Sequence, residues 1–254
     1  MAETILLIMY DTSRRIEACV LVTSGRSLSA ASRATGIARS TIRSWMESPE
    51  RPSRCCRCAG AWPTRGADYS ALLGYYLGDG CISIHRGHTT FRVSCDTAWS
   101  GVIEDVSSLV QAVQPSHGVF HVRAPGTTVV QANGKHWPCV FPQHGPGRKH
   151  ERKITLEDWQ SEMVTTFPGD FLRGLFHSDG ARVNNWATRV VAGEKRRYDY
   201  PRWQFSNRSE DILHLCGWAL DLADVAWRRS GPWTVSVSRR QAVATLDALI
   251  GLKS

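Results

Sequence analysis

Apolar and polar positions follow two alternating periodicities through most of the chain. Residues 91–95 and 203–207 alternate apolar and polar side chains, as half-buried strands do. Each segment is followed by an amphipathic pattern typical of a helix, over residues 102–113 and 211–225. The order of these patterns predicts an α+β fold between residues 67 and 254, in which the series helix, strands, helix, strands, helix occurs twice.

A short motif occurs twice within this region, with an offset of one hundred residues. Leu72–Gly80 has the sequence Leu-Leu-Gly-Tyr-Tyr-Leu-Gly-Asp-Gly, and Leu172–Gly180 has the sequence Leu-Arg-Gly-Leu-Phe-His-Ser-Asp-Gly. Each motif is a short apolar run, predicted to be helical, that ends in Asp-Gly. Because the strands and helices that follow also repeat, we expect a monomer with internal pseudo-symmetry, divided into halves at about 67–165 and 166–254.

Glycines occupy matched places in both motifs. A glycine inside a helix costs about 1 kcal/mol relative to alanine, and Gly74 and Gly174 would incur this cost twice. Their position predicts a close crossing of the two helices, where only small side chains fit. The glycines that end the motifs, Gly80 and Gly180, are predicted to adopt the left-handed conformation that commonly ends a helix.

The motifs also end in matched carboxylates, Asp79 and Asp179. Two carboxylates about 5 Å apart would repel by roughly 3 kcal/mol at an effective dielectric constant near 20, and both lie at the negative ends of helix dipoles. Single Asp-Gly helix ends are common, but their repetition favours a divalent metal site. We expect Mg²⁺, with Mn²⁺ as a substitute, at Asp79 and Asp179, and we assign Gly78 and Ser178 to the same site.

The charge balance indicates the class of partner. The chain has 31 Lys and Arg residues against 23 Asp and Glu, a net charge of +8, which favours a polyanion such as double-stranded DNA. No apolar stretch reaches the length of a membrane span. We therefore expect a cytoplasmic, nucleoid-associated protein without a membrane partner, whose eight cysteines are reduced.

The first 48 residues differ from the rest and predict a small helical domain. Leu28, Ala31 and Ala34 recur at helical spacing, and Gly36 provides a turn before a second helix. This pattern resembles the helix-turn-helix of repressors and transposases. The simpler alternative is a helical hairpin with a solvated basic face. In the DNA-binding interpretation, the residues that reach bases and phosphates are Arg39, Ser40, Thr41 and Arg43.

A proline- and arginine-rich linker is predicted over residues 49–66, and it contains a Cys-x-x-Cys formed by Cys55 and Cys58. Zinc needs four ligands, and a second such pair is absent from the sequence. Structural or incidental cysteines are therefore favoured over zinc. A zinc-stabilised binding module remains a third functional alternative.

The two Asp-Gly motifs resemble those of single-chain LAGLIDADG homing endonucleases, over about residues 67–254. The resemblance implies that each half has the order αββαββα, that the motif helices form the interface between halves, and that two curved sheets form a saddle over DNA. It further implies that the motif-final acids, Asp79 and Asp179, bind Mg²⁺ and cleave both strands across the minor groove.

The resemblance also implies supporting residues near each acid. The family often has a polar residue at the end of the first hairpin of each half. Asn207 matches this position in the second half, whereas Cys95 or Asp96 occupies it in the first half. This departure predicts that the two half-sites differ. A basic residue after the fourth strand corresponds to Lys149 or Lys153 in the first half. In the second half the candidates are Arg239 and Arg240.

Two basic stretches are candidates for contacts with DNA phosphates. The first is the Gly/Pro-rich loop at residues 144–153, and the second surrounds a predicted hairpin of the second half. Solvated loops are the simpler interpretation of both. The residues assigned to DNA binding are Arg148, Arg152, Lys195, Arg196, Arg197, Arg202, Gln204 and Arg208.

Two functions are consistent with these features. The first is a site-specific double-strand DNA endonuclease, which the presence of both acids favours. The second is a transcription regulator that uses the LAGLIDADG fold only to bind DNA. The fused helix-turn-helix favours this alternative, because the composition resembles actinobacterial sporulation regulators that join the same two domains in the reverse order.

Overall fold

A computed structural model describes residues 12–47, 66–85, 88–115 and 117–254, and the chain divides into two compact units, Met1–Ala61 and Trp62–Ser254. Cys55 and Cys58, where the sequence raised the question of zinc, lie outside the described residues. Among the residues described, no helix is both long and apolar enough to cross a membrane.

The described part of the first unit contains three helices around a small apolar core. They are α1 (Thr12–Thr23), α2 (Leu28–Thr35) and α3 (Arg39–Glu47). Ser27 caps α2 by accepting a hydrogen bond from the amide of Ala30, and Gly36 ends the helix in the left-handed conformation at φ 70°. Buried Ala18, Ala31, Ile37 and Ile42 form the core. The turn between α2 and α3 therefore forms for the reasons that the sequence suggested.

The second unit contains two halves with the same order of elements. The first half consists of α4 (Ala67–Leu77), β1 (Gly80–His85), β2 (His88–Asp96), α5 (Ser100–Val113), β3 (Val119–Ala124) and β4 (Thr127–Asn133), followed by α6 (Trp137–Val140), the 3-10 helix η2 (Lys149–Glu151) and α7 (Asp158–Thr166). The second consists of α8 (Pro168–Ser178), β5 (Gly180–Val191), β6 (Glu194–Ser206), α9 (Glu210–Leu222), β7 (Arg228–Gly231), β8 (Thr234–Val237) and α10 (Arg240–Ile250).

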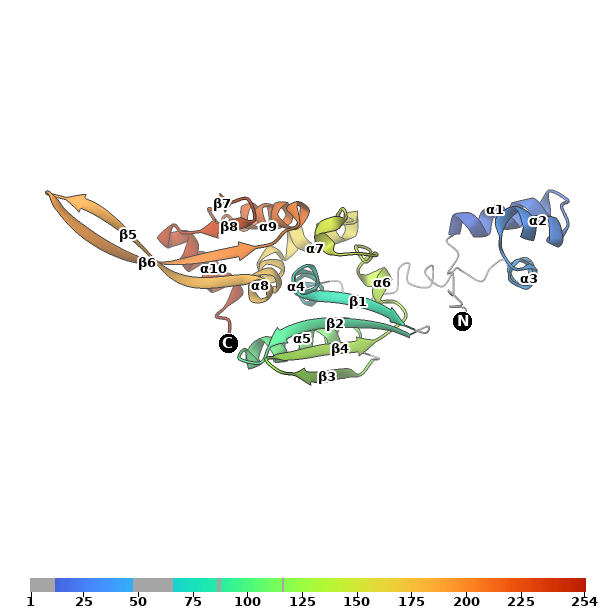
Figure 1. Cartoon of the computed structure of the whole chain (residues 1–254), viewed down its shortest axis with the longest axis horizontal. Helices are drawn as coiled ribbons and strands as arrows, with labels where there is room; N and C mark the ends of the chain where they lie inside the picture. The colour runs from blue at the N-terminus through green and yellow to red at the C-terminus, as the bar shows by residue number, and fades with distance from the viewer. Residues whose placement is uncertain (1–11, 48–65, 86–87, 116) are drawn as a thin grey trace. The chain divides into compact units, whose positions relative to one another are not determined.

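Each half contains one four-stranded antiparallel sheet, and the strand orders correspond. They are β1-β2-β4-β3 and β5-β6-β8-β7. Figure 1 shows the two sheets on either side of α4 and α8, which lie next to each other at the centre of the unit. The predicted α+β fold with a repeated helix-strand order is confirmed.

Helices α4 and α8 cross at their glycines. A Cβ atom on Gly74 would lie 2.3 Å from the main-chain oxygen of Phe171 and 2.9 Å from the Cα of Gly174. A Cβ on Gly174 would lie 2.1 Å from the main-chain oxygen of Ala71. Since real Cβ atoms do not approach so closely, the two backbones touch only because both residues are glycine.

The two glycines after the aspartates have a different role from the one predicted. Gly80 and Gly180 are the first residues of β1 and β5, and neither has a positive φ angle. A Cβ on Gly80 would lie 2.4 Å from the Cα of Tyr76, and one on Gly180 would lie 2.4 Å from the main-chain oxygen of Phe176. The prediction of a left-handed helix end is wrong, because each strand turns back tightly over its helix and excludes a side chain there.

The two halves differ most in their first hairpins. Strands β1 and β2 have 6 and 9 residues, whereas β5 and β6 have 12 and 13. Within β6, only residues 203–206 pair with β8. Residues 183–202 of β5 and β6 therefore form a two-stranded ribbon, here called the arm. Ala192 and Gly193, with φ angles of 52° and 84°, form the turn at its tip. The arm extends beyond the rest of its sheet in Figure 1.

Candidate active site

The structure brings the two predicted carboxylates to the adjoining ends of the crossing helices. Asp79 follows the last turn of α4, and Asp179 ends α8. A Cβ on Gly78 would lie 2.0 Å from Ser178 Oγ and 3.6 Å from the carboxylate oxygen Oδ2 of Asp179. The carboxylate of the second half therefore lies beside the helix end of the first half.

The pKa values of both carboxyl groups are raised. The side chain of Asp79 is open to solvent on one side, but the protein around it removes enough water to raise its pKa, with a further rise from Asp179, to about 6. Burial raises the pKa of Asp179 as well. A site in which two negative charges are unfavourable in this way gains from a bound cation.

A lysine lies at the end of each motif helix. Lys149 donates hydrogen bonds from Nζ to the main-chain oxygens of Tyr76 at 2.6 Å, of Leu77 at 2.9 Å, and of Gly78. Lys253 donates to the main-chain oxygen of Ser178 at 3.2 Å. Both ammonium groups thus occupy the negative end of a helix dipole.

Burial lowers the pKa of both lysines, to about 8 for Lys149. Their positive charges act in the opposite direction on the acids, since each lysine lowers the pKa of both Asp79 and Asp179. The two lysines are therefore the cations that compensate the carboxylate pair in the described part of the chain.

Lys253 is a site residue that sequence reasoning missed. Of the two candidates in the first half, Lys149 reaches the site, and Lys153 is exposed. In the second half the structure places Arg239 and Arg240 at the beginning of α10, and neither is among the charges that shift the aspartates. Lys253 follows the last helix, where no periodic pattern indicated a position.

The polar residue predicted beside each acid is present in one half only. Asn207 donates a hydrogen bond from Nδ2 to Asp179 Oδ2 at 2.8 Å, and its own Oδ1 accepts from the amide of Ser209 at 2.9 Å. Strand pairing matches Gly80 with Val93 and Gly180 with Phe205, so the counterpart of Asn207 is Cys95.

Cys95 does not replace the amide of Asn207. Burial and the neighbouring Asp79 raise the pKa of the Cys95 thiol to about 11, so the thiol stays neutral. The adjacent Asp96 is exposed and accepts a hydrogen bond from the amide of Ala98 at 2.9 Å. Within the described residues, Asp79 consequently has no side-chain hydrogen bond like that of Asp179.

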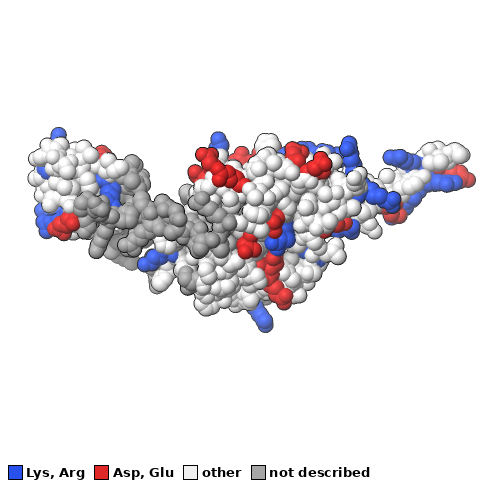
Figure 2. Space-filling view, turned by 180° about the vertical axis from the view of Figure 1, so that it is seen from behind, with Lys and Arg blue, Asp and Glu red and all other residues white. Residues whose placement is uncertain are grey.

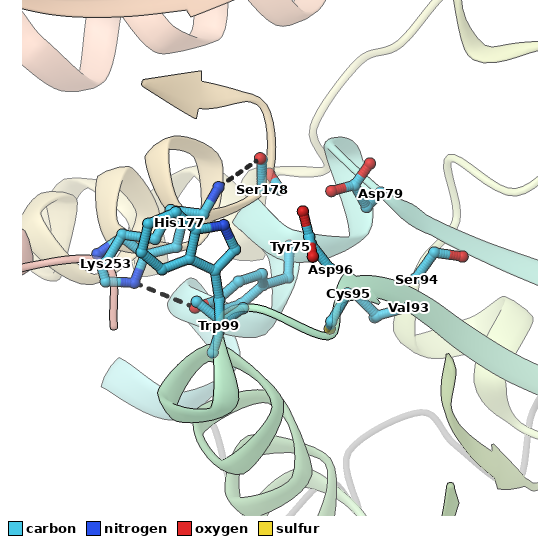
Figure 3. A pocket seen from close by; sticks show the side chains of 11 residues that line it. Tyr75, Asp79, Val93, Ser94, Cys95, Asp96, Trp99, His177, Ser178 and Lys253 are labelled. Atoms are coloured by element: carbon cyan, nitrogen blue, oxygen red, sulfur yellow. Dashed lines mark hydrogen bonds between the residues drawn. The ribbon is translucent and has the colours of Figure 1, made fainter. Parts of the chain in front are cut away.

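A pocket opens beside Asp79 at the junction of the two halves. Figure 3 shows its lining, in which side chains from the first half meet His177, Ser178 and Lys253 from the second. The residues contributed by the first half are Tyr75, Asp79, Val93, Ser94, Cys95, Asp96, Trp99 and Val102.

The donor atoms at the aspartate pair fit a hard divalent cation. They are the carboxylate oxygens of Asp79 and Asp179, the ligand type that Mg²⁺ and Mn²⁺ prefer. The main-chain oxygens of Gly78 and Ser178, which the sequence assigned to the same site, already accept hydrogen bonds from Lys149 and Lys253. No cluster of three or more His, Cys, Asp or Glu side chains suited to a metal occurs among the described residues. Mg²⁺ is commonly held by one or two carboxylates together with substrate phosphates, and this smaller set is sufficient for that arrangement.

The other predicted DNA-binding residues fall into two groups. Arg152 is committed to its own loop, because it donates to the main-chain oxygens of Gln143 and Gly147. Arg202 donates to Ser236 Oγ at 2.7 Å, and Arg197 pairs with Asp199 at 2.7 Å. The remaining assigned residues, whose side chains are likewise exposed or partly exposed, are Arg39, Ser40, Thr41, Arg43, Arg148, Lys195, Arg196, Gln204 and Arg208.

Comparison with known proteins supports the assignment of the fold. No protein-family model and no curated protein matches the sequence. Among solved structures, a structure of a mesophilic variant from the homing endonuclease I-DmoI is similar to this chain, with a TM-score of 0.50 and 11% sequence identity. The similarity covers 74% of this chain and 93% of that chain. The second unit has a LAGLIDADG-like fold.

Two further solved structures resemble the LAGLIDADG-like unit at lower TM-scores. I-DmoI in complex with DNA and Mn has a TM-score of 0.48 at 10% identity, over 74% of this chain and 99% of that chain. The N-terminal LAGLIDADG domain of DUF199/WhiA has a TM-score of 0.43 at 16% identity, over 75% of this chain and 86% of that chain.

Proposed function

We propose that this protein is a site-specific double-strand DNA endonuclease of the homing-endonuclease type. The observation that carries the proposal is the pair of carboxylates, Asp79 and Asp179, at the adjoining ends of two helices whose backbones touch. Their raised pKa values and the two compensating lysines indicate an arrangement made for cations and phosphate. Helix ends selected only for stability would avoid such a pair.

The residues of the site have distinct roles in this proposal. Asp79 and Asp179 would hold Mg²⁺, which supplies positive charge at the scissile phosphates and lowers the pKa of bound water. Asn207 fixes the orientation of the Asp179 carboxylate through its 2.8 Å hydrogen bond. Lys149 and Lys253 add positive charge next to the phosphate, where negative charge develops in the transition state.

The exposed faces of the sheets would bind the duplex. On β2 and β6, buried residues alternate with solvent-facing ones such as Arg92 and Gln204, so one face of each sheet is free of helices. The arm continues one of these faces and carries five basic and two acidic residues. Figure 2 shows Lys and Arg side chains along it. This excess of positive charge suits contacts with the phosphates of a duplex that extends past the sheet.

The helix-turn-helix unit would provide a second contact with DNA. Arg39, Ser40 and Arg43 are exposed on the N-terminal part of α3, the position from which recognition helices reach the major groove. A bound site recognised by both units would be longer than one recognised by the LAGLIDADG-like unit alone.

A second candidate function is a transcription regulator that binds DNA without cleaving it. One observation favours it. The ammonium groups of Lys149 and Lys253 already donate to the main-chain oxygens of Gly78 and Ser178, so each helix end is neutralised by a fixed positive charge. A metal ion could use these two oxygens only after the lysines move.

Selection from a random duplex pool, with and without Mg²⁺, separates the two functions. The variants Asp79→Asn and Asp179→Asn remove one carboxylate each, and Asp68→Asn is a matched control at the other, exposed end of α4. We expect cut duplexes only with Mg²⁺, only from the parent and the control. The regulator function is supported instead if the parent enriches a bound sequence but leaves it intact in Mg²⁺. Both aspartate variants should then bind the same sequence and leave it intact as well.

A further inference from the structure

The four residues after α10 cross from the second half of the LAGLIDADG-like unit to the first. The amide of Val102, in the first turn of α5, donates to the main-chain oxygen of Ser254 at 3.2 Å. Helix α5 has no side-chain cap at its beginning, and the first amides of a helix otherwise have no partner. Segment 251–254 therefore supplies an acceptor that α5 lacks.

The same segment brings Lys253 to the carboxylate pair. Its Nζ reaches the main-chain oxygen of Ser178, and it lies 5.8 Å from the ring centroid of Trp99, the residue that precedes α5. One segment thus places an oxygen at the positive end of α5 and an ammonium at the negative end of α8. The two electrostatic contacts join elements of different halves.

Gly101 leaves the space into which the segment docks. A Cβ on Gly101 would lie 2.2 Å from Ser254 Oγ and 2.9 Å from the main-chain oxygen of Ser254. Alanine would otherwise be favoured over glycine at this position inside a helix, by about 1 kcal/mol. The absence of a side chain at Gly101 is therefore explained by the segment that covers it.

His177 holds the other end of the segment. Its Nε2 lies 3.4 Å from the main-chain oxygen of Gly251, and its Nδ1 lies 3.3 Å from the hydroxyl of Tyr75. The Tyr75 hydroxyl donates to Asp105 Oδ2 at 2.9 Å, and Asp105 also pairs with Arg173. Polar groups buried in an otherwise apolar interface are costly unless they are paired. Because Tyr75 gives its proton to Asp105, a neutral His177 with its single N–H on Nε2 donates to the main-chain oxygen of Gly251, at the start of the segment.

The two lysines are consequently held by different means. Lys149 belongs to a short helix and donates to three main-chain oxygens of α4 and the residue that follows it. Lys253 depends on four residues, of which Leu252 is 71% exposed. The position of one compensating charge is fixed by three hydrogen bonds to the end of α4, and that of the other by a docked segment.

We propose that segment 251–254 is a strap that holds Lys253 at the aspartate pair by docking on α5, and that Gly101 and His177 are positioning residues for Lys253. The consequence for cleavage rests on the proposed endonuclease function. The docking itself does not, because its contacts are within the protein. When the strap detaches, the site keeps Lys149 and loses the second cation, so cutting of one strand slows more than cutting of the other.

The test compares Gly101→Ala with Gly66→Ala in the full chain. Gly66 precedes α4, and a Cβ there would meet nothing within 4 Å. Hydrogen exchange of the Val102 amide, followed by NMR, measures docking directly. We expect exchange to rise roughly fivefold or more in Gly101→Ala, as for the removal of one hydrogen bond, and to stay at the parental rate in Gly66→Ala. Lys253→Met should raise it too, because the link to Ser178 is removed.

Cleavage of a supercoiled plasmid gives the second measurement. Lys253→Met should slow one strand by roughly 100-fold or more relative to the other, so that nicked circles accumulate. Gly101→Ala should change the strand ratio in the same direction and add nothing to Lys253→Met in the double variant. A purely structural defect would slow both strands alike and would add to the effect of Lys253→Met.

Unchanged Val102 exchange in Gly101→Ala overturns the proposal. So does equal slowing of both strands by that variant, which would remove the role in positioning Lys253. If the parent binds DNA and never cuts it, the endonuclease function fails, whereas the exchange rates of Gly101→Ala and Lys253→Met still decide whether the strap docks.

Discussion

The two halves of the LAGLIDADG-like unit are most alike where they touch and least alike where they face solvent. At the crossing, Gly74 and Gly174 are equivalent, and the carboxylates of Asp79 and Asp179 are brought together. Away from it, one half has a short hairpin and the other a long arm. A contact between two backbones leaves no room for divergence, whereas a strand that leaves the core can lengthen without disturbing packing.

The largest effect should follow from a change at the crossing itself. Gly174→Val adds three side-chain carbon atoms at the crossing. The Cβ alone would lie 2.1 Å from the main-chain oxygen of Ala71, which is too close for any side chain. Separating α4 and α8 would open the core of both halves at once, and we expect the free energy of unfolding to fall by about 3 kcal/mol or more. Denaturant unfolding measures it. Gly231→Ala, where a Cβ would meet its nearest atom at 3.9 Å, should have little effect.

The second prediction concerns the residue beside each acid. Asn207→Ala removes the hydrogen bond to Asp179, and groups that orient metal ligands typically contribute 10–100-fold to affinity or activity. In the proposed endonuclease, we expect this change to slow the cutting of one strand roughly 10–100-fold in plasmid assays. Cys95→Ala, at the equivalent position, should change the rate only slightly. Equal losses in the two variants would show that the half-sites do not differ in this respect.

The arm provides the third prediction. Replacing residues 187–198 with a two-residue Asn-Gly turn removes Arg189, Lys195, Arg196 and Arg197 while leaving the pairs nearest the sheet. Binding of the selected duplex should become less dependent on salt, with the slope reduced by about 0.9 for each phosphate that the shortened arm no longer reaches. Footprinting should show protection shortened on one side of the cleavage position only. A footprint shortened on both sides, or unchanged, would remove the arm from the interface.

The smallest effect should come from the root of the arm. Asp247 in α10 accepts two hydrogen bonds from Arg182 and one from Trp203 Nε1, and these bonds hold its pKa below the usual value. A depressed pKa stabilises the fold above the unfolded-state value and loses this contribution as the pH falls through the folded value.

Asp247→Asn should therefore lower the free energy of unfolding by about 1 kcal/mol at pH 7, since the ion pair is partly exposed to solvent. The difference between the two proteins should shrink below about pH 4, where the carboxylate becomes protonated. Denaturant unfolding at a series of pH values tests this, and a constant difference at all pH values would contradict it.

The sequence patterns predicted those parts of the molecule that are determined by residues close together in the sequence. The repeated motif located the two helices and their aspartates, and alternating segments located β2 and β6. Asn207 was assigned through the family resemblance, which places a polar residue at the end of the alternating segment at 203–207. In each case the signal lay among close neighbours in the sequence.

Features that depend on distant segments were missed or misread. Lys253 reaches Ser178 across 75 positions, and nothing in a four-residue segment indicates that crossing. Gly80 and Gly180 looked like left-handed helix ends, but the steric contact that requires them is with the preceding helix. The length of the arm also escaped prediction, because exposed strands carry no apolar alternation to mark where pairing continues.

The contact between α4 and α8 sets the spacing of the two carboxylates by main-chain atoms rather than by side chains. Such a contact keeps the ends of the two helices at a constant spacing. Substitutions on the outer faces of the sheets change the surface that a partner would contact. They do not alter the contact between α4 and α8 or the spacing of the helix ends that carry Asp79 and Asp179. The surface that faces a partner can therefore vary by single side chains while the main-chain contact between α4 and α8 stays in place.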